Sequence, residues 1–293
     1  MIKRDTYIQR LALYKDCNVI KVLTGVRRSG KSVILRLYQD YLLKNGVDAS
    51  HIISVNFEEL ENAHLLDIHT LSAYISSKTK GKAKHYVFLD EVQNVPSFER
   101  VTDSLFVKNN IDLYLTGSNA KFLSSDLATL LSGRYIQIHV LPLSFSEYSS
   151  VFSTLDHTTL YQNYIAYGSF PYAVELFKMN PSAVREYVRS ILDTVIYKDV
   201  ISRHGIRPEG ILLDVLSFLM DNIGNPVSAK KIADSLTSAG RPVSSVTVDK
   251  YLDALTASYV LYPAKRFDLK GKRILQTNPK YYLVDMGLRS LLT

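Results

Sequence analysis

The sequence predicts an α/β fold in its first half, with a parallel β-sheet covered by helices, and a mainly helical second half. Two observations predict the sheet. Short β-branched runs alternate with stretches of helical periodicity, and two of these runs end in polar residues suited to phosphate and metal chemistry. A third observation, apolar residues at helical spacing from position 151 onwards, predicts the second half. A chain of 293 residues has room for two or three domains.

The composition describes a folded protein with an ample core, because 46% of the residues are hydrophobic and 22% are charged. Cys17 is the only cysteine in the sequence, which excludes an internal disulfide framework and a multi-cysteine zinc site. The residues after Met1 contain no apolar signal core, and no run approaches the roughly 20 apolar residues of a membrane span. These features predict a cytoplasmic protein that does not bind a membrane.

The net charge of +7 is unevenly distributed along the chain. Residues 221–293 contain 11 Lys and Arg against 6 Asp and Glu, so +5 of the +7 lies in this last quarter. Four more lysines alternate in one short segment: Lys78, Lys80, Lys82 and Lys84. Basic clusters of this kind suit phosphate backbones or acidic surfaces, but they are equally typical of a solvated face or loop.

A glycine-containing segment after the first predicted strand has the pattern of a phosphate-binding loop. Residues 18–24 form a short β-branched run, and Gly25–Ser32 (GVRRSGKS) then matches G-x-x-x-x-G-K-[ST] in full. Apolar residues recur at helical spacing after Ser32, so strand, loop and helix occur in the required order. Lys31 is expected to reach the β- and γ-phosphates and Ser32 to bind Mg²⁺. The residues expected to bind nucleotide are Gly25, Val26, Arg27, Arg28, Ser29, Gly30, Lys31, Ser32 and Val33.

A second motif ends in paired carboxylates. A strand is predicted at 51–57 and helical structure at 58–80, and the run 86–89 (YVFL) then leads into Asp90 and Glu91. This is the Walker B pattern, in which Asp90 would hold Mg²⁺ through water and Glu91 would polarise an attacking water. The alternative is that Asp90 and Glu91 only cap the following loop. This alternative is less favoured, because an intact phosphate-binding loop precedes the pair in the sequence.

Two further strands are predicted at 111–116 and 135–140. The first leads into Gly117, Ser118 and Asn119, where a polar side chain would lie between the two motifs and could sense the γ-phosphate. Asn119 is the first candidate for this role and Ser118 the second. Because nucleotides bind at the carboxyl ends of parallel strands, we expect all these residues to share one edge of the sheet.

Three domains are predicted: a P-loop ATPase core at 1–150, a helical lid or linker region at 151–208 and a winged helix at 209–293. Residues 151–210 are aromatic-rich and read as helices, with a linker at 204–208. Three helical patterns follow, and a hairpin is predicted between 259–267 and 274–276, with a last strand at 281–284. Three helices followed by a basic hairpin describe a winged helix.

DNA contact by this winged helix is expected, although the sequence gives signals for and against it. Five basic residues surround the hairpin tip and are the candidate contacts: Lys265, Arg266, Lys270, Lys272 and Arg273. Asp249 and Asp253 oppose it, because they would point carboxylates from the third helix at DNA phosphates. Winged helices also serve as packing modules, so a protein partner or self-association stays open.

The motifs together resemble those of prokaryotic AAA+-type ATPases (AAA_14, related to the archaeal ATPase group) that carry a DUF4143 region. The resemblance implies an ATPase core of the additional-strand type, with Glu91 as catalytic base, Asn119 as sensor and Lys31 stabilising charge. It also suggests that Arg134 acts as an arginine finger or sensor, in cis or toward a neighbouring subunit; pairing with an acidic neighbour is the alternative. The motifs that carry the resemblance are Gly25–Ser32, Leu89–Gln93, Leu115–Asn119, Leu131–Arg134 and Pro142–Tyr148, with a looser match around Tyr197–Val200.

Two features depart from that family pattern. Gly168 and Ser169 stand where members usually have a double glycine. Family members also commonly continue into a nuclease-like C-terminal domain, which we do not expect in this sequence, and no nuclease activity is assigned to it.

The sequence therefore predicts a Mg²⁺-dependent enzyme that binds and hydrolyses ATP and whose nucleotide state repositions a winged helix. The alternatives are a slow nucleotide-gated signalling switch and a transcription regulator with little turnover. A small-molecule kinase fits less well, because Asp90, Glu91 and Asn119 suit activation of water better than phosphorylation of a substrate.

Overall fold

The computed structural model describes residues 2–117, 131, 133–152, 154–267 and 278–292. Contacts between Cα atoms divide the chain into two units. The first unit contains residues 1–25 and 29–140, and the second contains 26–28 and 141–293. Within the described part of the chain, every helix is too short or too polar to cross a bilayer.

A five-stranded, fully parallel sheet forms the centre of the first unit, with the strand order β2-β3-β4-β1-β5. The strand β4 therefore lies between β1, which leads into the glycine-containing loop, and β3, which ends at Asp90. This is the additional strand that the sequence resemblance implied. The bounds are β1 (Ile20–Thr24), β2 (Ile52–Asn56), β3 (His85–Asp90), β4 (Ile111–Gly117) and β5 (Tyr135–His139).

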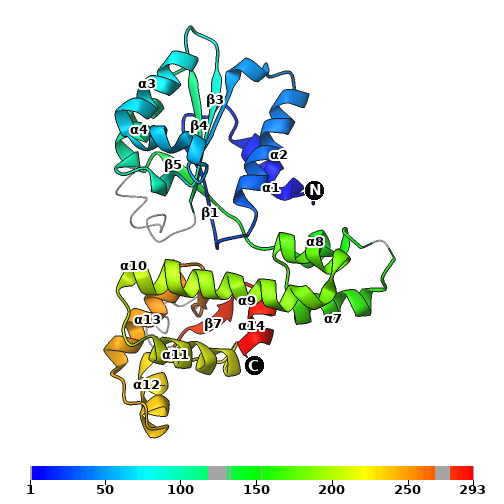
Figure 1. The fold of residues 1–293 in the computed structure, drawn as a ribbon, viewed down its shortest axis with the longest axis vertical. Helices are drawn as coiled ribbons and strands as arrows, with labels where there is room; N and C mark the ends of the chain where they lie inside the picture. The colour runs from blue at the N-terminus through cyan, green and yellow to red at the C-terminus, as the bar shows by residue number, and fades with distance from the viewer. Residues whose placement is uncertain (1, 118–130, 132, 153, 268–277, 293) are drawn as a thin grey trace. The chain divides into compact units, whose positions relative to one another are not determined.

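Helices cover both faces of this sheet (Figure 1). Successive residues of a strand point to opposite faces, so Phe88 packs with helices α1 and α2, whereas Val87 and Leu89 pack with α3 and α4. Both faces are buried, which explains why these strands read as nearly continuous apolar runs. The elements are α1 (Asp5–Leu13), α2 (Lys31–Lys44), η1 (Ala49–His51), η2 (Leu60–Leu66), α3 (Ile68–Lys78), η3 (Val92–Asn94) and α4 (Phe98–Phe106).

The second unit is mainly helical, as its periodicity predicts. In Figure 1, α9, a π-helical segment and α10 follow one another as a single rod. The bounds are α6 (Phe145–Ser149), α7 (His157–Tyr167), α8 (Pro171–Met179), η5 (Pro181–Ala183), α9 (Val184–Thr194), η6 (the π-helix, Val195–Ile201), α10 (Ser202–His204), α11 (Glu209–Asp221), α12 (Ala229–Ser238), α13 (Ser245–Ala257) and α14 (Met286–Leu292). One apolar core joins α9 to helices α11, α12 and α13.

A two-stranded antiparallel ribbon follows these last three helices. It consists of β6 (Leu261–Ala264) and β7 (Lys280–Leu283), and Pro226 adds an isolated bridge to Lys280. The sequence placed the return arm of the hairpin at 274–276; the described partner of β6 is instead β7, close to the predicted last strand. Residues 274–276 lie outside the described residues. Three helices and a ribbon agree with the order expected of a winged helix, and that designation stays a prediction.

A buried carboxylate joins the turn after α7 to the start of α14. The Asp285 carboxylate accepts hydrogen bonds from Ser169 N (2.6 Å), Ser169 Oγ (2.9 Å) and Gly287 N (2.9 Å). Burial raises the pKa of Asp285, and these donors act in the opposite direction. Ser169, which stands where the second glycine is usual, thus supplies two of the three donors, and one of them is its side-chain hydroxyl.

Gly168 is required at this turn for two reasons. Its φ is +79°, and a Cβ atom there would lie 2.1 Å from Asp285 Oδ1 and 2.9 Å from Gly287 N. Gly240 has the same φ of +79°, but among the described residues other than its chain neighbours a Cβ atom added to it would meet no atom within 4 Å. Gly168 therefore differs from Gly240 in steric overlap, and its ψ of −166° also places it in a backbone region that is essentially restricted to glycine.

We expect Gly168→Ala to lower the free energy of unfolding by about 3 kcal/mol or more, because strain and overlap add. Gly240→Ala, the matched control, should cost about 1–2 kcal/mol from strain alone. Urea unfolding of both variants measures the difference. Equal losses in the two variants would contradict the packing described for Asp285.

Candidate active site

The loop Gly25–Ser32 joins β1 to α2, and its backbone takes left-handed conformations at three positions. The φ values are +147° at Gly25, +68° at Arg28 and +95° at Gly30. A Cβ atom at Gly25 would lie 2.1 Å from the Val140 carbonyl oxygen, so only glycine fits there. Gly30 is the N-cap of α2 and has no side chain to occupy the first-turn amides. Such a loop and helix start offer backbone N–H groups to an anion.

Lys31, the first residue of α2, is 4% exposed. Its Nζ atom donates a hydrogen bond to the Gly25 carbonyl oxygen (3.1 Å) and lies 4.0 Å from Glu91 Oε1. Because a buried ammonium group requires partners, these contacts hold the lysine charge inside the loop. The structure thus brings the predicted lysine and the predicted base together.

Thr116, near the end of β4, links the Asp90 carboxylate to the backbone of Glu91. Its hydroxyl donates to Asp90 Oδ1 and accepts a hydrogen bond from Glu91 N (2.8 Å). The Ser32 hydroxyl also hydrogen-bonds Asp90. Burial raises the pKa of Asp90, whereas the bonds from Thr116 and Ser32 act in the opposite direction. Our sequence analysis placed the sensor candidates beyond Gly117 and did not predict a role for Thr116. The sequence did contain a signal for it, because Thr116 is a polar residue near the end of a mainly apolar strand.

Glu91 has a left-handed backbone, with φ of +54°, and is 8% exposed. Its Oε2 atom accepts a hydrogen bond from the Gln93 side-chain amide. The carboxylate is therefore held between Gln93 and Lys31. Sequence reasoning included Gln93 in the motif without giving it a role.

His139 is a further residue that sequence reasoning missed. It ends β5 beside Thr24, and its Nδ1 atom lies 3.3 Å from Thr24 Oγ1. Burial lowers the pKa of His139 to about 4, and the positive charge of Lys31 acts in the same direction. His139 is therefore neutral near pH 7 and lies at the same sheet edge as the loop.

Arg134 lies at the opposite end of the sheet. Its carbonyl oxygen accepts a hydrogen bond from Ile20 N (2.9 Å) at the start of β1, whereas the loop follows the last residue of β1. Five strand residues separate these ends by about 13 Å. The exposed guanidinium stacks on the Phe106 ring, 5.5 Å from its centroid. The structure does not bring Arg134 to the loop of its own chain, and a role toward a neighbouring subunit stays a prediction.

The predicted sensors Asn119 and Ser118 lie outside the described residues. So do Lys270, Lys272 and Arg273 of the predicted DNA contacts. Lys265 and Arg266 are described, and both are exposed beyond the end of β6.

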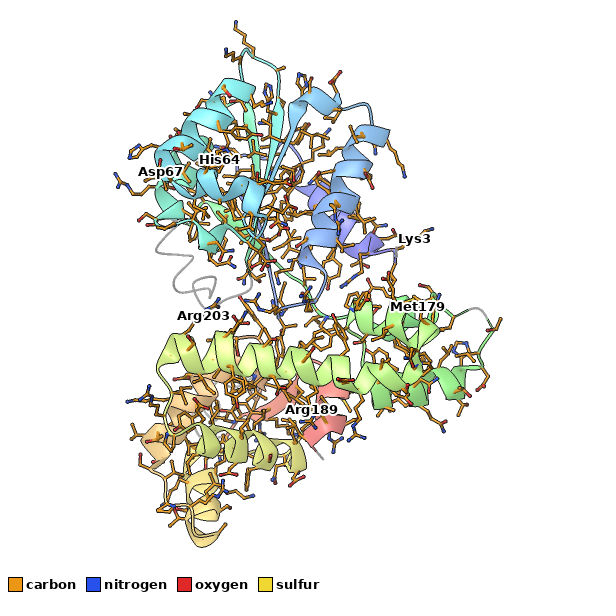
Figure 2. All side chains as sticks on the ribbon, viewed as in Figure 1. Lys3, His64, Asp67, Met179, Arg189 and Arg203 are labelled. Carbon is orange, nitrogen blue, oxygen red and sulfur yellow. The ribbon has the colours of Figure 1, made fainter. Side chains whose placement is uncertain are left out.

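Arg27, in the middle of the loop, belongs by its contacts to the second unit. Its Nε and Nη2 atoms donate to the two oxygens of Asp199 (3.1 and 3.2 Å), which lies in the π-helix and is 2% exposed. Arg203 is labelled in Figure 2, and its Nη1 atom lies 3.0 Å from Asp199 Oδ1. Val26 is fully buried in the core of the same unit.

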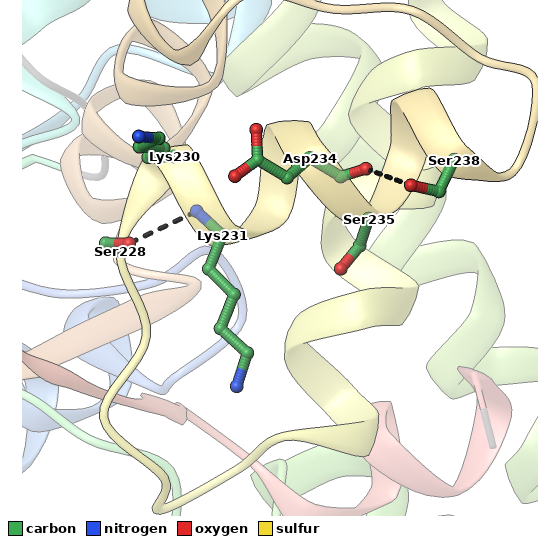
Figure 3. Close-up of a pocket in the computed structure, with 6 residues that line it drawn as sticks. All are labelled: Ser228, Lys230, Lys231, Asp234, Ser235 and Ser238. Atoms are coloured by element: carbon green, nitrogen blue, oxygen red, sulfur yellow. Dashed lines mark hydrogen bonds between the residues drawn. The ribbon is translucent and has the colours of Figure 1, made fainter.

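A surface hollow lies along α12 and is lined by Ser228, Lys230, Lys231, Asp234, Ser235 and Ser238 (Figure 3). The Ser228 hydroxyl accepts a hydrogen bond from Lys231 N (3.1 Å), and the Ser238 hydroxyl donates to the Asp234 carbonyl oxygen (2.9 Å). The Ser228 bond caps the start of α12, and the Ser238 bond lies in its last turn. Both serines therefore have a structural role in the helix.

Comparison with known proteins identifies the family of the chain. Residues 18–149 match the family model described as an AAA domain, and residues 158–293 match one described as a domain of unknown function, DUF8612. An uncharacterized protein of Haemophilus influenzae is 41% identical over 99% of this chain. The chain belongs to the family of that protein. It spans 73% of the relative's length.

The chain also has two more distant similarities. An uncharacterized protein of Methanocaldococcus jannaschii is 29% identical over 97% of this chain, which spans 64% of that protein. Among solved structures, a Walker-type ATPase of Pyrococcus abyssi superposes with a TM-score of 0.68 at 16% identity, over 100% of this chain and 96% of that one. This likeness shows the fold. The first unit is thus an AAA-type P-loop fold, and the second matches DUF8612 rather than the expected DUF4143.

We expect His139 to make the chain less stable in mild acid. The unfolded chain takes up a proton below about pH 6.5, whereas the folded chain keeps His139 neutral down to about pH 4. The free energy of unfolding of the wild type should therefore fall as the pH drops between these values. The free energy of unfolding of His139→Gln should fall less steeply over the same range. Urea unfolding at stepped pH measures this, with the exposed His64 (Figure 2), changed to Gln, as control. Parallel profiles for wild type and His139→Gln would contradict the expectation.

Proposed function

We propose that this protein is a Mg²⁺-dependent ATPase whose nucleotide state repositions its C-terminal winged helix. The supporting observation is the cluster of buried Lys31, Asp90 and Glu91 with half-buried Ser32 at the carboxyl edge of the sheet, where the loop Gly25–Ser32 begins. Glycine loop, lysine, hydroxyl and paired carboxylates are the parts that phosphoryl transfer to water requires.

The donor set at this edge fits Mg²⁺. Ser32 and Asp90 offer hard oxygen atoms that already lie within hydrogen-bond distance of each other. Among the described residues, His, Cys, Asp and Glu side chains do not form a group of three that could hold a metal ion. A magnesium ion held by one carboxylate and one hydroxyl takes its other ligands from phosphate and water. When bound, it neutralises charge on phosphate oxygens.

The side chains of the chain itself have separate tasks in this proposal. Lys31 exchanges its bond to the Gly25 carbonyl for phosphate oxygens and stabilises their charge. Glu91 orients the attacking water and accepts its proton. Thr116 fixes the direction of the Asp90 carboxylate and holds the backbone of Glu91, because its hydroxyl bonds Asp90 and the Glu91 amide at once. Asn119 remains the proposed sensor of the γ-phosphate.

Coupling between nucleotide and the second unit follows from the loop itself. Val26, Arg27 and Arg28 belong to the second unit by their contacts, although they lie between Gly25 and Ser29 of the first. A change in the loop backbone when phosphates bind would therefore alter the ion pair between Arg27 and Asp199. The partner reached in this way is double-stranded DNA or a protein. Lys265, Arg266, Lys270, Lys272 and Arg273 favour DNA, and Asp249 and Asp253 oppose it.

A slow nucleotide-gated switch is the second candidate function. One observation favours it: Glu91 accepts a hydrogen bond from Gln93 and its Oε1 atom lies 4.0 Å from Lys31 Nζ, so both oxygens of the proposed base already have partners in this arrangement. Release of Glu91 would then limit turnover. A transcription regulator with little turnover would share this behaviour.

Phosphate release from Mg-ATP, with and without double-stranded DNA, tests the proposal directly. We expect turnover by the wild type and a loss of about 10²-fold or more in Glu91→Gln, since a general base contributes about 10²–10⁴-fold. Asp90→Ala should also lose turnover. Stimulation of the wild type by DNA would identify DNA as the partner.

The control is Glu99→Gln, at a half-buried glutamate in the first turn of α4, which should behave as the wild type. Wild-type turnover in Asp90→Ala would overturn the mechanism. Binding of ATP without turnover by the wild type would favour the switch.

We expect Asp199→Asn to uncouple the second unit from nucleotide. The neutral amide cannot hold the two arginines, which are partly exposed and remain solvated. Amide hydrogen exchange of residues 184–204, with and without Mg-ADP, measures this. Nucleotide-dependent protection should disappear in Asp199→Asn and persist in the exposed control Asp193→Asn. Unchanged protection in Asp199→Asn would contradict this route of coupling.

A further inference from the structure

A buried arginine lies behind the phosphate-binding loop, in a part of the chain with no sequence motif. Arg4 precedes α1 and is 2% exposed. Its Nη1 atom donates a hydrogen bond to the Ser29 carbonyl oxygen (3.1 Å), 25 residues away in the sequence. Its guanidinium also stacks on the Tyr7 ring, 4.6 Å from the centroid. Burying a guanidinium costs free energy, so a contact of this kind calls for a reason.

The acceptor of this hydrogen bond, the Ser29 carbonyl oxygen, lies in the loop directly before the start of α2. The Ser29 carbonyl and the Gly30 N–H form one peptide group, and Gly30 is the N-cap of α2. Phosphate loops hold anions with inward N–H groups, so their carbonyl oxygens have to point away from the anion. A donor that binds the Ser29 carbonyl from outside favours that orientation. It also polarises the peptide, which makes the Gly30 N–H a stronger donor.

The charge of Arg4 acts in the same direction. A guanidinium group carries a permanent positive charge in proteins. In buried surroundings its field is screened less than in water, so it adds to the positive potential that Lys31 and the start of α2 create. Both effects favour bound phosphate in general and do not depend on the state of the bond that is cleaved.

We propose that Arg4 is a positioning residue for nucleotide phosphates: it holds the Ser29–Gly30 peptide with its N–H toward the anion and adds fixed positive charge behind the loop. The inference rests on the proposed function only in requiring that the loop binds nucleotide. Loss of Arg4 is expected to change nucleotide binding and not the chemical step. Affinity for nucleoside di- and triphosphates depends on Arg4, whereas the rate of the chemical step does not.

The test compares Arg4→Met, Arg4→Gln and Arg10→Met. Methionine removes charge and donor, and glutamine removes the charge but keeps an N–H donor. Arg10 is an exposed arginine of α1, the helix that follows Arg4, and it donates to the Gln137 carbonyl oxygen (3.4 Å), so Arg10→Met is the matched control. Titration calorimetry gives the Kd of each variant for Mg-ADP and Mg-ATP. Phosphate release gives kcat and KM, and thermal unfolding without nucleotide shows that each variant is folded.

We expect Arg4→Met to raise the Kd for Mg-ADP and for Mg-ATP by a similar factor, about tenfold or more, equivalent to about 1.4 kcal/mol. KM should rise accordingly while kcat stays within about twofold. Arg4→Gln should fall between Arg4→Met and the wild type, and Arg10→Met should match the wild type. A residue that only stabilised α1 would lower the unfolding temperature without this division between KM and kcat.

Wild-type affinity in a folded Arg4→Met protein would overturn the inference. If Arg4→Met does not fold, Arg4→Gln decides: a Kd several-fold above the wild type supports the inference, and a wild-type Kd overturns it. The binding of Mg-ADP separates this inference from the proposed function. A wild type that binds Mg-ADP but releases no phosphate would defeat the proposed ATPase and leave the Arg4 measurement intact.

Discussion

The parallel hydrogen-bonded register of β3, β4 and β1 is the constraint on which the candidate site depends. It pairs Leu89 with Leu115 and Val22 with Leu115 across three adjacent strands. The three strands therefore end at one edge, and the residues that follow them meet there. Parallel strands need long crossovers, and the helices that make these crossovers bury both faces of the sheet. Without that burial, the short apolar strands could not hold charged side chains at their ends.

The charged groups at this edge are largely withdrawn from water. Lys31, Asp90 and Glu91 are each less than a tenth exposed, so each has to be compensated within the site. Lys31 bonds the loop carbonyl of Gly25 and lies beside Glu91. Thr116 donates to the Asp90 carboxylate, and Gln93 donates to the Glu91 carboxylate. A site arranged in this way is organised before any ligand arrives. Ligand phosphates would replace contacts that already exist, which keeps the cost of reorganisation low.

The loop itself is held by two arginines of different origin. Arg4 approaches the Ser29 carbonyl from the segment before the first helix, and Arg27 extends from the loop to Asp199 in the π-helix. Single π-helical turns occur often at functional sites, because they place one side chain where a regular helix would not. Both arginines contact groups distant in sequence. The loop is therefore not an isolated motif but a segment whose conformation the rest of the chain influences.

The sequence by itself determined the elements whose causes are local. The glycine pattern of 25–32, the β-branched runs before Gly25 and Asp90, and the helical spacing after residue 151 predicted the loop, the strands and the helical second half, because turns and periodicity depend on neighbouring residues. Only the tertiary structure decided the strand order and the surroundings of the site. Thr116, His139 and Arg4 join it, and Arg134 does not, because their positions follow from hydrogen bonds and burial between segments that are far apart in the sequence. Apart from the polar residue near the end of β4, long-range packing of this kind leaves no local pattern in the sequence.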